Sequence, residues 1–256
     1  MTTTPARWAF LDWPHPIPFA HRGGAGDWPE NSMLAFEHAV GLGYRYVETD
    51  VHVTADDVLV AFHDDALDRV TDRTGTIGSL PWSEVARARI DGREPIVLFE
   101  DLLGAWPDVR INVDPKHDRS VVPLAAVIER TAAHDRVCVG AFSDRRLGRF
   151  RKLTGGRVCT SMGPADVARL RLASTGVPTG RFAAACAQVP TRAAGRVLVD
   201  RRFAAAAHRR GIKVHVWTID DPAEMTRLLD LGVDGLMTDR PAVLKEVLIA
   251  RGQWAA

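Results

Sequence analysis

Cysteine is scarce in this sequence, since 256 residues contain only three. Cys138, Cys159 and Cys186 lie far apart in apolar stretches and show no metal-ligand spacing. An odd number without such spacing is typical of buried thiols in a reducing compartment. The first sixteen residues also lack a basic start followed by an apolar core, so we expect no signal peptide and a cytoplasmic protein.

Long apolar runs and a charge imbalance are absent as well. No run approaches the roughly 18 apolar residues of a membrane helix, which predicts no membrane insertion. With 33 basic and 32 acidic residues the net charge is +1, which argues against a general binder of nucleic acid or membrane surfaces. An apolar content of 46% and a charged content of 25% are typical of a soluble globular protein.

Strand-like and helix-like segments alternate along most of the chain. Outside a central hairpin, we expect strands near residues 17–20, 109–114, 137–141, 158–161, 185–189, 214–218 and 235–238, with helices between most of them. This alternation predicts an α/β fold, a (β/α)8 TIM barrel that forms one domain over residues 1–256. With the two hairpin strands this makes nine expected strands, one more than the barrel holds. The extra strand is assigned to the hairpin or to the weak region near 185. A doubly wound sheet is the alternative, but Gly24-Ala25-Gly26 lacks the third glycine of its nucleotide fingerprint.

The hairpin over residues 45–63 carries the densest group of reactive side chains. Alternation through its first strand places Glu48 and Asp50 on one face, where two carboxylates can bind a single cation. The connection is too short for a parallel crossover, which predicts antiparallel pairing. A turn centred on residues 55 and 56 would set Asp50 opposite Ala61 and Glu48 opposite His63.

Several other strands also end in reactive residues. The set comprises His21, Arg22, Glu48, Asp50, His63, Asp114, Lys116, Trp217, Asp239 and Arg240. Barrel strands present their carboxyl ends on one face, so these residues are expected to converge. The carboxylates favour a hard divalent cation, Mg²⁺ or Ca²⁺. Lys116 and Arg22 favour an anionic, phosphate-bearing substrate, and His21 and His63 can exchange protons near neutral pH. Together they indicate metal-assisted phosphodiester cleavage.

Two assignments stay open at this point. Trp217 is equally consistent with core packing and with lining the substrate pocket. Asp64 could orient His63 or cap the turn that follows it, and the turn is slightly favoured. His52 shares the parity of Glu48 and Asp50, but its position near the turn favours a structural role.

The chain resembles the glycerophosphodiester phosphodiesterase family. The matching pieces, in the family's order, are His21-Arg22-Gly23, Pro29-Glu30-Asn31-Ser32, Glu48-Thr49-Asp50-Val51, residues 54–57, His63-Asp64 with Leu67 and Arg69, Asn112-Val113-Asp114-Pro115-Lys116, Ala141-Phe142-Ser143, Val216-Trp217-Thr218 and residues 235–241. The resemblance implies a barrel, His21 and His63 as the catalytic acid–base pair, and Glu48, Asp50 and Asp114 as metal ligands. It also implies hydrolysis of a small glycerophosphodiester to sn-glycerol 3-phosphate and an alcohol such as choline or ethanolamine.

Departures from the family pattern leave the reactive groups in place. Asp114 stands where the family usually has Glu, and Asp56-Asp57 replaces the usual Asp-Gly turn. A lysophospholipase D activity on the same fold and a catalytically silent binder of polyol phosphates are the alternatives. The head group, the physiological metal, the oligomeric state and the nucleophile, which is water or a glycerol hydroxyl, stay open.

Residues 66–95 interrupt the strand–helix alternation. They are polar and turn-rich, with weak helical character from Ser83 to Ile90, which predicts a small surface insertion after the third strand. Since the insertion follows His63 at the reactive end of the barrel, we expect it to control which diesters are accepted. It has no long apolar surface for an acyl chain, which favours a small water-soluble alcohol group.

Overall fold

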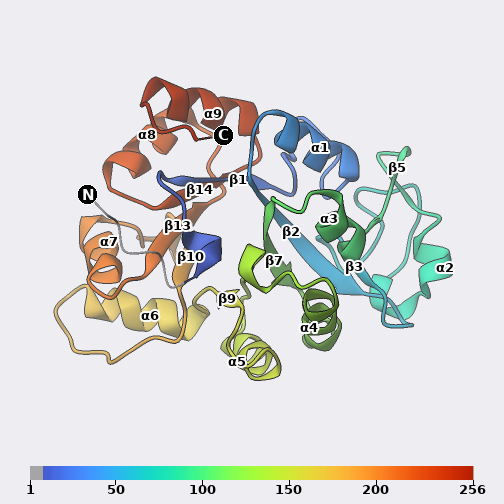
Figure 1. The fold of residues 1–256 in the computed structure, drawn as a ribbon, viewed down its shortest axis with the longest axis horizontal. Coiled ribbons are helices and arrows are strands. Elements are labelled where there is room, and N and C mark those ends of the chain that lie inside the picture. Colours follow the sequence, from blue (N-terminus) through green and yellow to red (C-terminus); the bar gives the residue numbers. More distant parts are fainter. Residues whose placement is uncertain (1–7, 256) are drawn as a thin grey trace.

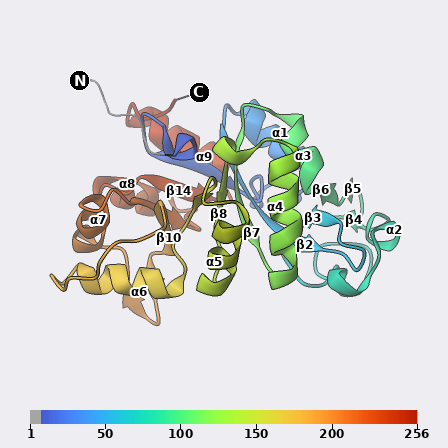
Figure 2. The same cartoon turned by 60° about the horizontal axis from the view of Figure 1, so that its bottom comes forward.

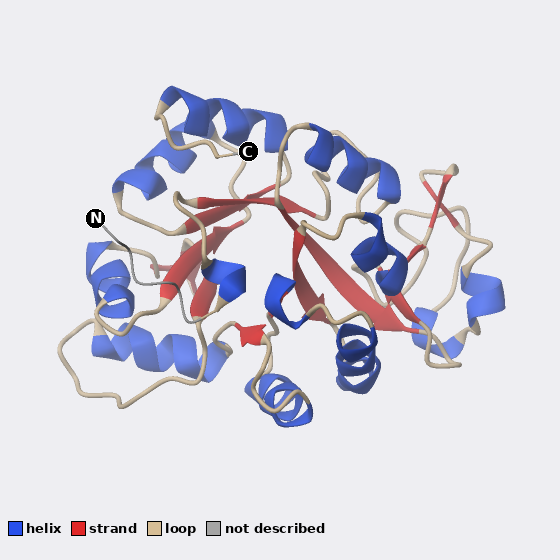
Figure 3. Ribbon diagram, in the orientation of Figure 1, coloured by secondary structure: helices blue, strands red, loops and turns tan. Residues whose placement is uncertain are grey.

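The computed structural model describes residues 8–255, and within that range eight parallel strands form a nearly closed ring (Figures 1 and 3). In spatial order they are β10 (Cys186–Pro190), β13 (Lys213–Trp217), β14 (Gly235–Thr238), β1 (Ile17–His21), β2 (Tyr46–Val53), β7 (Arg110–Pro115), β8 (Val137–Val139) and β9 (Cys159–Thr160). A parallel bridge between Ser161 and Cys186 joins the two ends of this order. The predicted barrel is confirmed, and the weak strand near 185 is one of its strands.

Helices cover the outside of the ring. They are α1 (Met33–Gly41), α3 (Phe99–Ala105), α4 (Val121–Arg130), α5 (Asp144–Leu153), α6 (Pro164–Ala173), α7 (Arg201–His208), α8 (Pro222–Asp230) and α9 (Pro241–Ala250). Figure 2 shows α4 and α5 standing upright against the part of the ring that holds β7 and β8. Serine or aspartate side chains cap several first turns, as Ser32 does for α1 and Asp221 for α8. None of the helices among residues 8–255 combines the length and apolarity needed to cross a membrane.

Helix α6 was not predicted. Its apolar pattern is interrupted by arginines, and only Leu170 and Ala173 are buried, while Leu172 is 50% exposed. Proline at its first position, Pro164, was the remaining local signal of a helix start. A short hairpin of β11 (Arg192–Ala193) and β12 (Arg196–Val197) was also not predicted.

The predicted pairing of the hairpin was wrong by one residue. β2 pairs with β3 (Leu59–Ala61) through Val51 opposite Ala61 and Val53 opposite Leu59. The loop holds three residues, 55–57, because Thr54 N donates to Val58 O over 3.0 Å and Asp57 adopts the left-handed region with φ 63°. The additional loop residue shifts the register, so His63 is not paired across from Glu48 and lies beyond the end of β3.

The segment from 66 to 95 is built from short elements. They are the 3-10 helix Ile77–Ser79, α2 (Trp82–Val85), β4 (Arg89–Ile90) and β5 (Glu94–Pro95), so the weak helix expected from Ser83 to Ile90 ends early. Phe62, Leu67, Ile77, Val85 and Ile90 form a separate apolar cluster there. β6 (Val97–Leu98) then pairs with β3 and returns the chain to the barrel. Figure 1 shows α2 and β5 at the edge of the molecule, away from the ring.

The lower part of the barrel interior, at the amino ends of the strands, is apolar. Phe10 and Leu11, from the 3-10 helix Ala9–Leu11, pack there against Phe19 of β1 and Tyr46 of β2. The Tyr46 ring lies 5.3 Å from each of the two phenylalanine rings. The segment before β1 therefore closes this end of the barrel.

Candidate active site

One cavity of about 900 Å³ opens at the carboxyl ends of the barrel strands. Its lining includes all the residues predicted for the site, namely His21, Arg22, Glu48, Asp50, His63, Asp114, Lys116 and Trp217. Parallel strands bring their carboxyl ends to one face of a barrel, which is how side chains from both ends of the chain meet here.

Arg22 reaches the cavity because the chain turns sharply after β1. Arg22 and Gly23 both adopt left-handed φ angles, 50° and 83°. A Cβ on Gly23 would lie 2.8 Å from the Cβ of Ala35 in α1, so this position requires glycine. The turn lets Arg22 N donate to Glu48 Oε2 over 3.2 Å and places its Nε 3.2 Å from Asp50 Oδ2.

Three acids and a lysine form the centre of the site, and two of the acids, Glu48 and Asp50, are buried. Lys116 Nζ lies 2.6 Å from Asp50 Oδ1 and 3.2 Å from Asp114 Oδ2. Glu48 and Asp50 are neighbours on the inward face of β2 and are 5% and 2% exposed. Burial, followed by the charge of Asp50, raises the pKa of Glu48 to about 7, and burial also raises the pKa of Asp114. The nearby basic side chains therefore do not fully stabilise the negative charge of the three carboxylates.

The donor set fits a hard divalent cation. Asp50 Oδ2 and Asp114 Oδ1 are buried and, within residues 8–255, accept no hydrogen bond. Asp50 Oδ2 is ion-paired with Arg22 Nε, and oxygen ligands are those that Mg²⁺ and Ca²⁺ prefer. The donor type of Glu48, Asp50 and Asp114 therefore fits such an ion.

His21 is anchored by a carboxylate. Its Nδ1 lies 2.6 Å from Asp239 Oδ1, which leaves Nε2 directed towards the acids, 3.7 Å from Glu48 Oε2. Burial lowers the pKa of His21, but Glu48 and the bond to Asp239 more than offset this and raise it overall. Asp239 was noted among the strand-end residues, but its contact with His21 was not foreseen.

His63 is held in the same way. The Nδ1 of His63 lies 2.5 Å from Asp64 Oδ1, and the backbone oxygen of His63 lies 2.9 Å from His52 Nε2. Asp64 thus contacts His63. The sequence had slightly favoured the other interpretation, in which Asp64 caps the turn that follows. The hydrogen bond from Arg69 lowers the pKa of Asp64 to about 2, so its carboxylate stays charged beside the ring. His52 is buried and contacts the backbone of His63.

Glu30 joins the surroundings of the two histidines. Arg22 Nη1 donates to Glu30 Oε1 over 3.2 Å, and Arg69 Nη2 donates to the same oxygen over 2.7 Å. Arg69 Nε also donates to Asp64 Oδ2 over 2.5 Å. Glu30 and Arg69 were assigned no role from the sequence, and this ion-pair chain places them around Asp64, whose contact with His63 was one of its two interpretations.

Asn112 and Gln188 form part of the cavity wall and were also missed. Gln188 Nε2 donates to Asn112 Oδ1 over 2.7 Å. Asn112 lies two residues before Asp114 and therefore faces the same side of the strand, and this spacing could have identified it as a cavity residue. Gln188 lies in the weak strand near 185, where the sequence offered no clear orientation.

Most of the rest of the wall is apolar, although Arg171 and Arg196 also line it. Phe142, which is 69% exposed, meets Trp217 edge-on at 5.6 Å between ring centroids, and both line the cavity. Further apolar lining comes from residues 162–198, including Met162, Val189 and Leu198. No described residue from 66 to 95 lines the cavity, so the expectation that this insertion controls substrate choice is not supported by its position.

Comparisons with known proteins agree on one family. The model of the glycerophosphoryl diester phosphodiesterase family matches residues 21–243. A Mycobacterium tuberculosis protein named "Probable glycerophosphodiester phosphodiesterase 2" is 41% identical over 93% of this chain and 92% of its own length. A lysophospholipase D from Homo sapiens is 26% identical over 90% of this chain and 85% of its own length.

Solved structures show the same fold. A phosphodiesterase from Oleispira antarctica, in complex with the product sn-glycerol-3-phosphate, superposes with a TM-score of 0.78 at 21% identity, covering 92% of this chain and 97% of that one. A glycerophosphoryl diester phosphodiesterase domain from Mycobacterium tuberculosis gives a TM-score of 0.77 at 22% identity, covering 92% of this chain and 99% of that one.

Proposed function

This chain belongs to the glycerophosphoryl diester phosphodiesterase family, and from that premise we propose that it hydrolyses glycerophosphodiesters to sn-glycerol 3-phosphate and an alcohol in a metal-dependent reaction. One observation carries the proposal. Two histidines, each anchored through Nδ1 by its own carboxylate, line the cavity that holds the acids Glu48, Asp50 and Asp114.

Glu48, Asp50 and Asp114 are the residues that would hold the divalent cation. A cation bound there stabilises the negative charge that develops on the phosphoryl oxygens. Arg22 and Lys116 bring further positive charge to the same cavity and are suited to binding the phosphate. Both basic side chains already contact Asp50, so substrate and cation would meet in one place.

His21 and His63 divide the proton transfers. The anchored Nδ1 of each ring fixes its orientation and leaves Nε2 to take or give a proton. One ring removes the proton of the nucleophile, which is water or a glycerol hydroxyl, and the other protonates the leaving alkoxide. The charged carboxylates Asp239 and Asp64 stabilise whichever imidazole is protonated.

The aromatic pair at the cavity wall favours a cationic alcohol group. Phe142 and Trp217 expose ring faces and edges that can contact a quaternary ammonium. We therefore expect glycerophosphocholine to be accepted better than glycerophosphodiesters with an uncharged alcohol. The three free, buried cysteines support the proposal of a cytoplasmic enzyme.

The test is an assay of glycerophosphocholine with and without a chelator, in which choline and glycerol phosphate are both quantified. Release of both products in equal amounts, lost with chelator and restored by Mg²⁺ or Ca²⁺, supports the proposal. Tight binding of glycerophosphocholine without turnover in the presence of either metal would instead identify a silent binder.

A lysophospholipase D activity is the second candidate, and the apolar wall favours it. Residues 162–198 provide apolar surface beside the acids, which the segment from 66 to 95 does not. Lysophosphatidylcholine below its micelle concentration should be compared with glycerophosphocholine by kcat/KM. The variant Val197→Asp places a charge on this wall, so it should reduce lysolipid turnover and leave glycerophosphocholine turnover unchanged if an acyl chain binds there.

A further inference from the structure

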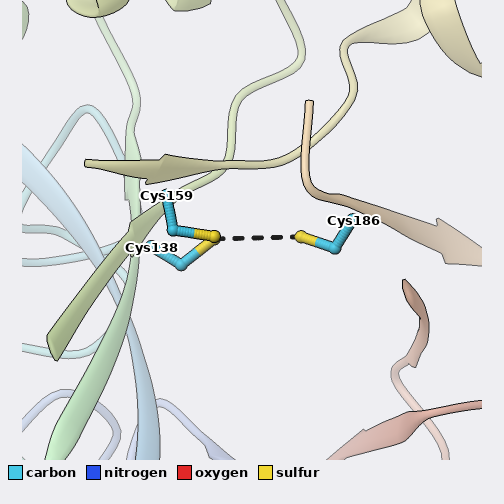
Figure 4. A group of neighbouring side chains, drawn as sticks. All are labelled: Cys138, Cys159 and Cys186. Atoms are coloured by element: carbon cyan, nitrogen blue, oxygen red, sulfur yellow. Dashed lines mark hydrogen bonds between the residues drawn. The ribbon is translucent and has the colours of Figure 1, made fainter. Parts of the chain in front are cut away.

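The three cysteines, far apart in sequence, meet inside the barrel. Cys138, Cys159 and Cys186 come from the adjacent strands β8, β9 and β10 (Figure 4). Each residue offers a sulfur that lies within 4.8 Å of the other two. All three side chains are buried and free of disulfides. Sequence spacing could not reveal this cluster, because each cysteine occupies a different barrel strand.

The separation of two of the sulfurs matches that of a thiolate metal site. Cys138 Sγ and Cys186 Sγ are 3.8 Å apart. A tetrahedral zinc ion with Zn–S bonds of about 2.3 Å holds its sulfurs about 3.8 Å apart. The distance is far too long for a disulfide, whose sulfurs are about 2.05 Å apart.

A buried imidazole lies beside one of the sulfurs. His215 of β13 is fully buried, and its Nε2 has no hydrogen-bond partner among the described residues. β13 pairs with β10, with His215 opposite Gln188, so Cys186 is two residues away on the same inward face. The imidazole of His215 also interacts with the Cys186 thiol. The converging donors are therefore the three sulfurs, and His215 contacts one of them.

A nearby guanidinium can balance the charge of such a site. Three thiolates and Zn²⁺ carry a net charge of −1, which is costly inside a barrel unless a cation is close. Arg151 donates to Thr160 Oγ1 over 2.8 Å and to Ser161 O over 2.9 Å, immediately after Cys159 in the chain. The cluster is therefore next to a fixed positive charge.

We propose that Cys138, Cys159 and Cys186 bind one Zn²⁺ ion in the interior of the barrel. Soft sulfur donors distinguish this ion from the hard cation of the carboxylate site above it. Gln188, two residues after Cys186, contacts Asn112 in the cavity wall, so an ion held by Cys186 would stiffen the floor of the cavity. The inference rests on the fold and does not depend on the proposed function.

Since the site is enclosed, the protein should be produced and refolded in the presence of the metal. Co²⁺ serves as the spectroscopic probe, because thiolate-bound Co²⁺ gives strong near-ultraviolet charge-transfer bands that oxygen-bound Co²⁺ lacks. We expect about one thiolate-bound ion per chain. X-ray absorption of the wild-type zinc protein should give Zn–S distances of about 2.3 Å. The loaded protein should melt about 5 °C or more above the metal-free protein.

Variants separate this site from the other metal-binding groups. Cys159→Ser should abolish the charge-transfer bands. His117→Ala is the matched control, because His52, Asp65 and His117 form the second group of converging metal ligands among the described residues, and it should leave the bands unchanged. Oxygen and nitrogen ligands alone in the zinc spectrum would overturn the proposal. So would three freely titratable thiols in protein refolded with excess metal, or a disulfide between Cys138 and Cys186.

Discussion

The two ends of the barrel interior are built on the same strands and have opposite chemistry. On β1 the inward residues change from Phe19 to His21, and on β2 from Tyr46 to Glu48 and Asp50. In the lower end, Tyr46 Oη donates to Phe10 O over 2.7 Å, and its ring packs between aromatic neighbours. In the upper end, carboxylate oxygens of Asp50 and Asp114 are buried without hydrogen bonds.

This difference separates stability from function along single strands. The lower end buries large side chains against one another, which is what stabilises a fold. The upper end concentrates acids whose pKa values are raised by burial, and such arrangements persist where ligand binding or catalysis requires them. Changes in the upper end should therefore alter activity, and changes in the lower end should alter stability.

Removing the divalent cation should have the largest effect, confined to the upper end. Chelation should abolish hydrolysis, because the three acids would then repel one another and the phosphate. Activity is measured before and after exhaustive EDTA treatment, with recovery on adding Mg²⁺ or Ca²⁺. Full activity in the metal-free enzyme would refute the metal role of Glu48, Asp50 and Asp114.

Loss of either anchored histidine should come next in size. His21→Ala and His63→Ala should each lower turnover at least about a hundredfold while the protein stays folded, since each ring carries one of the two proton transfers. His134→Ala is the matched control, because His134 pairs with Glu129 on the outer surface. The circular dichroism of each variant reports folding. Near wild-type turnover in either variant would rule out the acid–base assignment.

The sequence predicted the upper end better than the details of its loops. Strand parity and strand ends were sufficient to bring Glu48, Asp50, Asp114 and Lys116 together, because alternation and parallel order are properties of the whole fold. The hairpin register failed because Asp57 adopts a left-handed conformation that is usual for glycine. A single loop residue then changed every cross-strand pair.

Contacts between distant segments could not be read from one sequence. The bond between His21 and Asp239 joins the first and last barrel strands, and only the closure of the ring brings them together. Helix α6 was missed because its buried residues are few, and with it the apolar wall formed by residues 162–198. The expectation that residues 66–95 shape the pocket followed chain order, but the ring places a different segment over the cavity.

A matched pair of changes on β2 sharpens the contrast. Tyr46→Phe removes the hydroxyl that bonds Phe10 O and Arg110, so it should lower the free energy of unfolding by about 1–2 kcal/mol and leave turnover unchanged. Glu48→Gln, two residues further along, should lower turnover at least about tenfold without a comparable loss of stability. Denaturant unfolding and steady-state kinetics give both quantities. Equal losses of stability in the two variants would contradict a division between the ends.

Asp114 offers the smallest and most discriminating change within the upper end. Asp114→Glu restores the side-chain length usual in the family and keeps the charge, so metal affinity should stay within about tenfold of the wild type. Asp114→Asn keeps the size and removes the charge, and it should weaken metal binding more, because hard-cation sites with few ligands depend on carboxylate charge. Lys116 contacts Asp114 and should tolerate either length, since its Nζ also has Asp50 as a partner. Metal titrations followed by calorimetry rank the variants without relying on turnover. If the asparagine variant binds metal as tightly as the glutamate variant, then charge at position 114 does not hold the ion, and the ligand set reduces to Glu48 and Asp50.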